Sequence, residues 1–184
     1  MDSLETERLI LRKYEKDDFD AVHSYASCLE NVIYMNWGPN SARDTRTFIR
    51  SSIKKANKKP CTHYIYAVVL KDSRQLIGGC ELSIQGTCGH LGWIFHRAYW
   101  GRGYGTEAAK ALLDFGFGKL NLRRILSDCY ADNHGSYRIM EKIGMRREGL
   151  FLECAPPPKL TDREYGDEVR YALLKKEWEV QHKH

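Results

Sequence analysis

The chain of 184 residues lacks any long hydrophobic run, and its charged first eight residues do not form the apolar segment of a secretory leader. We therefore expect a cytoplasmic protein without membrane association. A glycine- or serine-rich linker is also missing, and so is an internal repeat. Residues 1–184 are thus predicted to form one domain, long enough to bury a core without disulfides.

Metal-binding cysteine spacings are absent as well. The chain has six cysteines but no C-x-x-C pair, and no cysteines and histidines at zinc-finger spacing. We expect no metal site, and reduced thiols buried as small hydrophobic side chains. The formal net charge of +5 is modest, so direct nucleic-acid binding is not predicted. An anionic cofactor would account for a basic surface equally well.

Hydrophobic periodicity divides the chain into the strands and helices of an α+β fold. Strands are expected at residues 4–14, 64–71, 75–84, 90–96, 125–130 and on both sides of the loop 155–162. Helices are expected at residues 16–30, 43–57, 104–118 and 135–143. Short turns join the three central strands, which predicts an antiparallel meander within a mixed sheet.

A glycine-rich loop between a strand and a helix carries the clearest chemical signal. Its sequence at 100–105 is WGRGYG, and an amphipathic helix follows directly. Glycines let backbone N–H groups turn toward one point, and a helix N-terminus adds unpaired donors and a positive dipole. The pattern therefore predicts an anion site that suits a pyrophosphate.

Three other interpretations of this loop compete with a pyrophosphate site. It could be a plain glycine-rich turn. The string GYGTEA at 103–108 also satisfies the G-x-G-x-x-A form of dinucleotide folds, but such a fold needs alternating βαβ units, and here a meander precedes the loop. A P-loop is excluded because the Gly-Lys-Ser/Thr sequence is missing.

The loop resembles the phosphate-binding motif Q/R-x-x-G-x-G/A of the GNAT acetyltransferases, with Trp100 in place of the usual first Gln or Arg. The longer string YWGRGYGTEA at 99–108 resembles the RimJ/RimL branch, the protein N-terminal alanine and serine acetyltransferases. Further matches are ETERLILR at 5–12, NHGS at 133–136, MEKIGM at 140–145, EG at 148–149 and YALLKKEW at 171–178. The resemblance covers nearly the whole chain, in the order of the predicted elements.

This resemblance implies the GNAT fold, a mixed and mostly antiparallel sheet of seven strands flanked by about four helices, with strands four and five splayed. It also implies acetyl-CoA as cosubstrate, with the pyrophosphate on the loop and the pantetheine arm between the splayed strands. The residues that it assigns to CoA are Trp93, Ile94, Phe95, Trp100, Gly101, Arg102, Gly103, Tyr104, Gly105, Thr106, Asn133 and Ser136.

The resemblance gives candidates for the catalytic groups. Many GNAT enzymes use a tyrosine as general acid, but the matching residue here is Met140, which has no proton to give. Ser136 resembles the residue that contacts or protonates the thiolate in the RimJ/RimL branch, although it could be an ordinary first-turn serine; Tyr137 is a weaker substitute.

Three carboxylates compete for the role of general base. Glu153 lies close in sequence to the position at which the RimJ/RimL branch has a catalytic Glu. Counting along the chain, the directly matching residue is Ala155, and strand alternation puts Glu153 on the same face as Ala155. Asp128 matches an acidic position of other N-terminal acetyltransferases, and Glu81 is a further rival. A carboxylate on a strand is more often a solvated residue of the exposed face, and this alternative applies to each of them.

The implied function is acetyl-CoA-dependent N-acetylation of an amine. We favour the α-amine of a protein or peptide, because its deprotonation at pH 7 costs about 1 kcal/mol, against roughly 4 to 5 kcal/mol for a lysine. A small amine such as a polyamine, amino acid or aminoglycoside is the first alternative. A non-catalytic acyl-CoA-binding regulatory module is the second, since Met140 replaces the usual acid.

The predicted partners are acetyl-CoA and the amine acceptor, and we expect a monomer or a homodimer. By analogy with the family, Tyr34, Trp37 and the loop at Pro156 are candidates for lining the acceptor cleft. For Trp37 we prefer packing in the core, because large aromatic side chains are usually buried.

Overall fold

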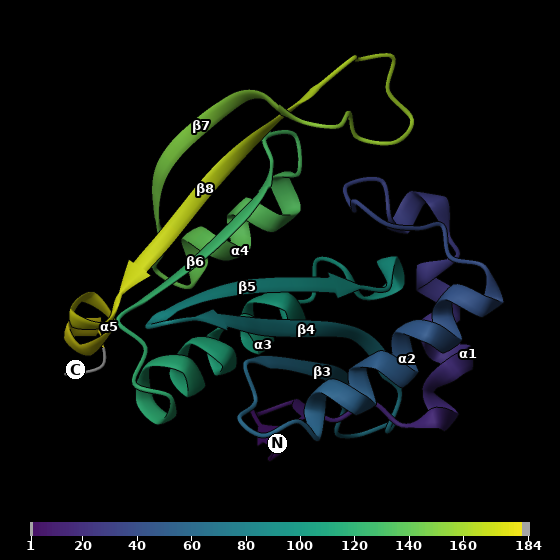
Figure 1. Cartoon of the computed structure of the whole chain (residues 1–184), viewed down its shortest axis with the longest axis horizontal. Coiled ribbons are helices and arrows are strands. Elements are labelled where there is room, and N and C mark those ends of the chain that lie inside the picture. The colour runs from purple at the N-terminus through teal and green to yellow at the C-terminus, as the bar shows by residue number, and fades with distance from the viewer. Residues whose placement is uncertain (1, 182–184) are drawn as a thin grey trace.

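A single eight-stranded sheet runs through the computed structural model, which describes residues 2–181 (Figure 1). Its order is β1-β2-β3-β4-β5-β6-β8-β7. The strands are β1 Leu4–Glu5, β2 Leu9–Arg12, β3 His63–Leu70, β4 Leu76–Gln85, β5 Cys88–Phe95, β6 Arg124–Tyr130, β7 Arg146–Ala155 and β8 Gly166–Leu174. Only β5 and β6 pair in parallel, and all other neighbours are antiparallel. The predicted mixed α+β sheet is confirmed.

Different helices pack on the two faces of the sheet (Figure 1). They are α1 Phe19–Ala26, α2 Ala42–Ala56, α3 Tyr104–Asp114, α4 His134–Lys142 and α5 Lys175–Gln181. On β3, Tyr66 and Val68 belong to the core cluster that includes residues of α3, whereas Ile65 and Ala67 belong to the cluster with residues of α1 and α2. Because successive side chains of a strand face opposite ways, β3 is hydrophobic on both faces.

The parallel pair β5–β6 opens after three residues. Residues 88–90 of β5 pair with residues 124–126 of β6, and the two strands make no further ladder contacts. At the point of divergence the Ser127 hydroxyl donates to the Leu91 carbonyl over 3.0 Å. Beyond it, β6, β8 and β7 diverge from β5 while remaining part of the same sheet (Figure 1). The expected splay is confirmed, and it leaves the edge of β5 beyond residue 90 without a strand partner.

Several elements differ from the prediction. The N-terminal strand expected over 4–14 is divided by a turn, in which the Thr6 amide donates to the Leu9 carbonyl over 3.0 Å, so the sheet has eight strands instead of seven. The helix expected over 104–118 continues as a π-helical turn from Phe115 to Lys119. Helix α5 was missed, and its Trp178 ring packs 5.7 Å from the Phe117 ring.

The cysteines within the structure are all free thiols, but their expected burial is wrong for most of them. Cys80 is buried, Cys154 is exposed, and the other four are half-buried. Cys154 lines a cavity, and Cys129 lines the same cavity while also packing against the core. Among residues 2–181, no helix is long and apolar enough to cross a membrane.

An ion-pair network joins β6, β7 and α5. Glu148 accepts from Arg124 Nη1 over 2.9 Å and from Arg146 Nη2 over 2.8 Å, and Arg146 also pairs with Glu177. The hydrogen bond from Arg124 is the main cause that lowers the pKa of the Glu148 carboxyl. A lowered folded-state pKa means that the stabilisation is present above about pH 4.3, the unfolded value, and is lost as the pH falls through the folded one.

We therefore expect Glu148→Gln to lower the free energy of unfolding by about 1 kcal/mol at pH 7. The difference from the wild type should shrink as the pH falls below about 4.3, because the wild-type carboxyl is then protonated as well. Urea unfolding at a series of pH values measures it. Glu7→Gln, at an exposed residue, is the control, and an E148Q difference that persists at low pH would contradict the assignment.

Candidate active site

The loop between β5 and α3 presents an array of free backbone amides. Gly101 and Gly103 have positive φ angles of 75° and 83°, which glycine adopts without strain. Helix α3 begins directly after Gly103, and its first backbone bond runs from the Glu107 amide to the Gly103 carbonyl over 3.0 Å. The amides of residues 101–106 donate to no group within residues 2–181. Such an array at a helix N-terminus suits an anion.

Residues of the N-terminal segment contact the loop and the first turn of α3. Glu107 accepts from the Thr6 hydroxyl over 2.6 Å, from the Arg8 amide over 2.8 Å and from Arg8 Nε over 2.7 Å. The Arg8 guanidinium also donates to the Arg102 carbonyl over 3.1 Å and lies 4.6 Å from the centre of the Tyr104 ring. Residues around the turn at Thr6 therefore fix the first turn of α3.

Trp100 anchors the other end of the loop. It is 56% exposed, and its indole N–H donates to the Phe95 carbonyl over 2.7 Å. The same carbonyl accepts from Asn31 Nδ2 over 3.0 Å. The Phe95 carbonyl is thus already occupied, whereas Trp93 and Ile94 lie on the part of β5 that has lost its β6 partner.

Two cavities meet where β5 and β6 diverge. The loop cavity, about 570 Å³, is lined by the glycine loop. The sheet cavity, about 690 Å³, lies on the face of α1 and α2, and Tyr25 of α1 and Phe48 of α2 are among its lining residues. The residues that line both are Tyr34, Met35, Trp93, Ile94, Asn133 and Ser136. An elongated ligand that starts at the glycine loop and follows the free edge of β5 therefore reaches the sheet cavity near Ser136.

The two cavities differ in charge. The charged residues that line the loop cavity are Glu30, Asp132, Arg138 and Lys142, so its anion-binding character comes from the loop amides rather than from an excess of basic side chains. The sheet cavity is lined by Glu81, Asp128 and Glu168 and by no lysine or arginine of residues 2–181. It suits a cation, and aromatic side chains such as Tyr34 and Trp37 form its apolar part.

Lys159 connects two loops that border the sheet cavity, the loop after β7 and residues 32–37. Its ammonium donates to the carbonyls of Val32 over 3.2 Å, Trp37 over 3.0 Å and Met35, and its amide donates to Ile33 over 3.0 Å. Burial lowers the pKa of this amine. The loop after β7 is thereby held against residues 32–37, of which residues 34–37 line one side of the cavity.

Replacing Lys159 with methionine keeps the stem and removes the three donations, and hydrogen bonds from a charged group contribute about 1.5 to 3 kcal/mol. We expect amide hydrogen exchange at residues 32–37 to accelerate at least about 10-fold, which corresponds to 1.4 kcal/mol. Lys110→Met, at an exposed residue of α3, serves as the control. Equal exchange in both variants would show that Lys159 does not fasten this segment.

The start of α4 brings two predicted site residues to the junction of the cavities. Asn133 is the N-cap, and its Oδ1 accepts from the Ser136 amide over 3.2 Å. The Ser136 hydroxyl donates to no group within residues 2–181. Met140 is fully buried in the core, and neither it nor Tyr137 lines either cavity. Of the predicted proton donors, only Ser136 lies at the junction.

Comparison with known proteins agrees with this geometry. The sequence profile described as "Acetyltransferase (GNAT) domain" matches residues 8–146. The chain belongs to the GNAT family. It is similar to YnaD of Bacillus subtilis (strain 168), an uncharacterized N-acetyltransferase, with 36% identity over 177 residues that cover 94% of this chain and 97% of YnaD.

Solved structures support the same family. A GNAT-family acetyltransferase from Bacillus anthracis is 35% identical, with a TM-score of 0.84 over 96% of this chain and 100% of that one. The microcin C7 self-immunity acetyltransferase MccE, solved with acetyl-CoA and AMP, shares the fold at 18% identity, with a TM-score of 0.76 over 92% and 93% of the two chains. The protein is therefore an acetyl-CoA-dependent N-acetyltransferase, and the GNAT resemblance is confirmed.

Histidines accompany two of the three base candidates in this acetyltransferase. Asp128 Oδ1 lies 2.8 Å from His90 Nε2, and this hydrogen bond is the main cause that lowers the pKa of the Asp128 carboxyl. Glu81 Oε2 lies 2.7 Å from His63 Nε2, which likewise lowers the pKa of Glu81, and His63 Nδ1 lies 3.3 Å from the Lys55 ammonium. Both carboxylates line the sheet cavity, and so does His90.

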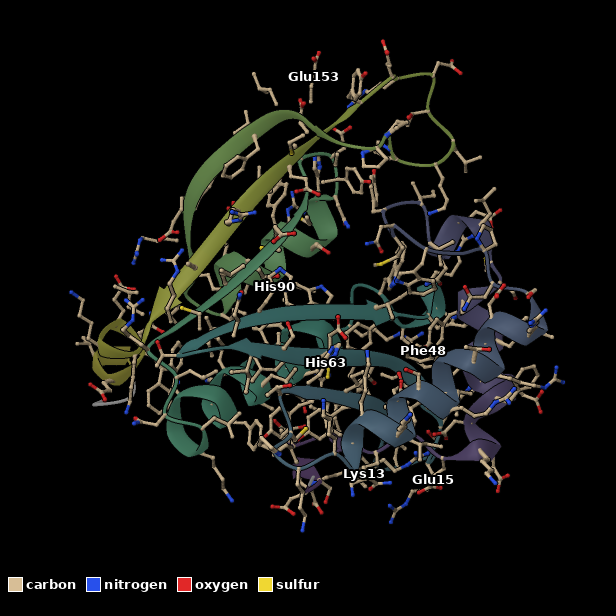
Figure 2. All side chains as sticks on the ribbon, in the orientation of Figure 1. Lys13, Glu15, Phe48, His63, His90 and Glu153 are labelled. Carbon is tan, nitrogen blue, oxygen red and sulfur yellow. The ribbon has the colours of Figure 1, made fainter. Side chains whose placement is uncertain are left out.

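Glu153 is not brought to either cavity. It lies on the outer side of β7 and points away from the molecule (Figure 2). The register of β7 shifts between Phe151 and Ala155, and Glu153 has a φ of 48°. Regular alternation, on which its predicted orientation depends, therefore does not hold there.

The predicted acceptor residues do meet in the sheet cavity, which is lined by Tyr34, Trp37 and Pro156. The preference for a core position of Trp37 is wrong. Its side chain is 37% exposed, because residues 32–37 form an irregular segment at the cavity rim instead of packing under the sheet.

Proposed function

We propose that this acetyltransferase transfers the acetyl group of acetyl-CoA to the α-amine of a protein or peptide N-terminus in the sheet cavity. One observation carries the proposal. The cavity that holds the free loop amides and the acidic sheet cavity join at Ser136 and the free edge of β5. A thioester bound from one side would meet an amine that enters from the other.

The residues around the loop cavity provide the contacts that CoA needs. The amides of residues 101–106 would take the diphosphate, and the free edge at Trp93 and Ile94 would pair with the pantetheine amides. Asn133 uses its Oδ1 for the helix cap and keeps its amide N–H groups for the ligand. We assign Ser136 to protonate the departing thiolate, because its hydroxyl is a free donor at the junction and, unlike the Asn133 amide, can be reprotonated in a catalytic cycle.

The sheet cavity supports an amine acceptor. Its three carboxylates attract an ammonium, and its aromatic lining can hold the apolar part of the acceptor. An α-amine fits the modest base strength present there, since its deprotonation at pH 7 costs only about 1 kcal/mol. Histidine titrates in the same range and is suited to accept such a proton.

A small polycationic amine is the second candidate. The observation that favours it is the lack of lysine and arginine among the residues of 2–181 that line the sheet cavity, together with its three carboxylates. A polyamine would satisfy more than one of these carboxylates at once, whereas a peptide N-terminus presents one ammonium.

An acceptor panel separates the two candidates. CoA release would be measured with a peptide that has a free α-amine and no lysine, with its α-acetylated counterpart that carries one lysine, and with spermidine. We expect the highest kcat/KM for the free α-amine. A higher kcat/KM for spermidine would show that a polyamine is the acceptor. A higher kcat/KM for the lysine peptide would exclude the α-amine as the preferred acceptor. CoA binding without transfer to any amine would indicate the regulatory module.

A further inference from the structure

We propose that His90 is the general base of this acetyl transfer and that Asp128 is its positioning residue. The inference rests on the proposed function and adds a residue that the sequence patterns do not single out. His90 lies at the last position of β5 that pairs with β6, beside the point where β6 departs (Figure 2). Its side chain is 42% exposed and lines the sheet cavity.

The hydrogen bond to Asp128 determines the protonation of the ring. An ionised carboxylate only accepts hydrogen bonds, so His90 Nε2, 2.8 Å from Asp128 Oδ1, carries the hydrogen. The neutral ring then has its lone pair on Nδ1, which has no hydrogen-bond partner within residues 2–181. A carboxylate that orients an imidazole whose second nitrogen is free is the arrangement of known acid–base catalysts.

The sheet register places this ring next to the free edge of β5. His90, Gly92 and Ile94 share one face of the strand, so no side chain stands between the imidazole and Ile94 on β5 itself. Three residues of strand, about 10 Å, separate His90 from Trp93.

Charged groups from the neighbouring strands surround the ring. Glu81 of β4 leans over Gly92, where a Cβ would lie 3.2 Å from its Oε1, and His63 of β3 and Lys55 of α2 stand behind Glu81. Asp128 of β6 lies on the other side. The charged residues contributed by β8 are Glu168, which lines the cavity, and Arg170, whose Nε lies 3.9 Å from Asp128 Oδ1.

Asp128 and Glu81 place negative charge on two sides of the ring, and Arg170 places a positive charge farther away, on Asp128. Asp128 itself is held in its ionised form by the hydrogen bond from His90. It therefore acts through the imidazole.

The reaction balances with these groups. His90 Nδ1 takes one proton from the acceptor ammonium, and the neutral amine attacks the thioester carbonyl, forming the C–N bond. The C–S bond then breaks, and the Ser136 hydroxyl gives its proton to the thiolate. The second proton of the former ammonium passes to the Ser136 oxygen and restores the hydroxyl. His90 releases its proton to water. The net products are the acetylated amine, CoA and one proton.

The test compares His90→Gln, Asp128→Asn and Glu81→Gln, with Ser83→Ala as the control at the register partner of His90 on β4. We expect His90→Gln to lower kcat/KM about 100-fold or more, with unchanged CoA affinity by calorimetry. The acid limb of its pH profile should vanish. Asp128→Asn should keep this limb and lower kcat while the KM for the acceptor stays the same, since the imidazole loses the carboxylate that orients it. Glu81→Gln should raise KM for the acceptor and retain the limb.

Two peptides with α-amines of different pKa separate the enzyme limb from the titration of the substrate, because only the substrate limb moves between them. His90→Asn, with thermal unfolding of each variant, guards against a folding defect. Wild-type rates and an intact acid limb in both His90 variants would overturn the proposal, as would loss of the limb in Glu81→Gln alone. A wild-type enzyme that acetylates no amine would instead overturn the proposed function.

Discussion

Replacement of Gly103 by valine is expected to weaken CoA binding at least about 100-fold while leaving the fold intact. Gly103 has a φ of 83° and is the N-cap of α3. The nearest atom to an added Cβ is Arg8 Nη2 at 3.4 Å, so the effect comes from the backbone and not from a clash. A β-branched residue avoids this φ and turns the neighbouring amides away. Loss of two amide–phosphate bonds of about 1.5 kcal/mol each corresponds to this factor.

Gly86→Val is the matched control for this variant. Gly86 also has a positive φ, 60°, in the turn between β4 and β5, and an added Cβ would meet no atom within 4 Å. Both variants carry the same kind of backbone strain, so both should lose a similar amount of thermal stability. Calorimetric titration with CoA separates them, and equal affinities in the two variants would contradict the role of the loop.

The second large effect is expected for Gly78→Ala, which should lower the free energy of unfolding by about 3 kcal/mol. An added Cβ would lie 2.3 Å from the Ile94 carbonyl oxygen and 2.8 Å from Phe95 Cα. Both contacts are to backbone, so β4 and β5 must separate at this point. Because the free edge of β5 includes Ile94, CoA affinity should fall as well.

Gly118→Ala is the control for this substitution. The nearest atom to its added Cβ is Trp178 Cη2 at 3.8 Å, an ordinary contact. We expect it to leave the unfolding free energy within about 0.5 kcal/mol of the wild type. Urea unfolding monitored by circular dichroism measures both variants. A Gly78→Ala protein as stable as Gly118→Ala would show that the β4–β5 contact is not as tight as described.

The parts of the fold that are local in sequence were predictable. The continuous apolar run of β3 and the glycine loop before α3 both follow from short-range patterns, and the structure has each of them. The division of the first strand depends on one turn at Thr6, and α5 depends on the packing of Trp178 against Phe117. Neither has a strong periodic signal of its own.

The site was only partly predictable, because its side chains meet across strands. His90 and Asp128 are 38 residues apart, and they pair only because residues 88–90 align with 124–126 in the parallel ladder. A register between two strands cannot be read from either strand alone. For Glu153 a local pattern gave the wrong prediction. The register shift in β7 removes the alternation that would have put Glu153 on the same face as Ala155.

The most direct test of the anion site is amide NMR of the protein during titration with CoA. The amides of residues 101–106, which have no partner within residues 2–181, should show the largest shifts, and inorganic pyrophosphate should shift the same signals. Pantetheine, which lacks the diphosphate, should leave them nearly unchanged and affect residues 93–94 instead. CoA-induced shifts that bypass residues 101–106 would contradict the account.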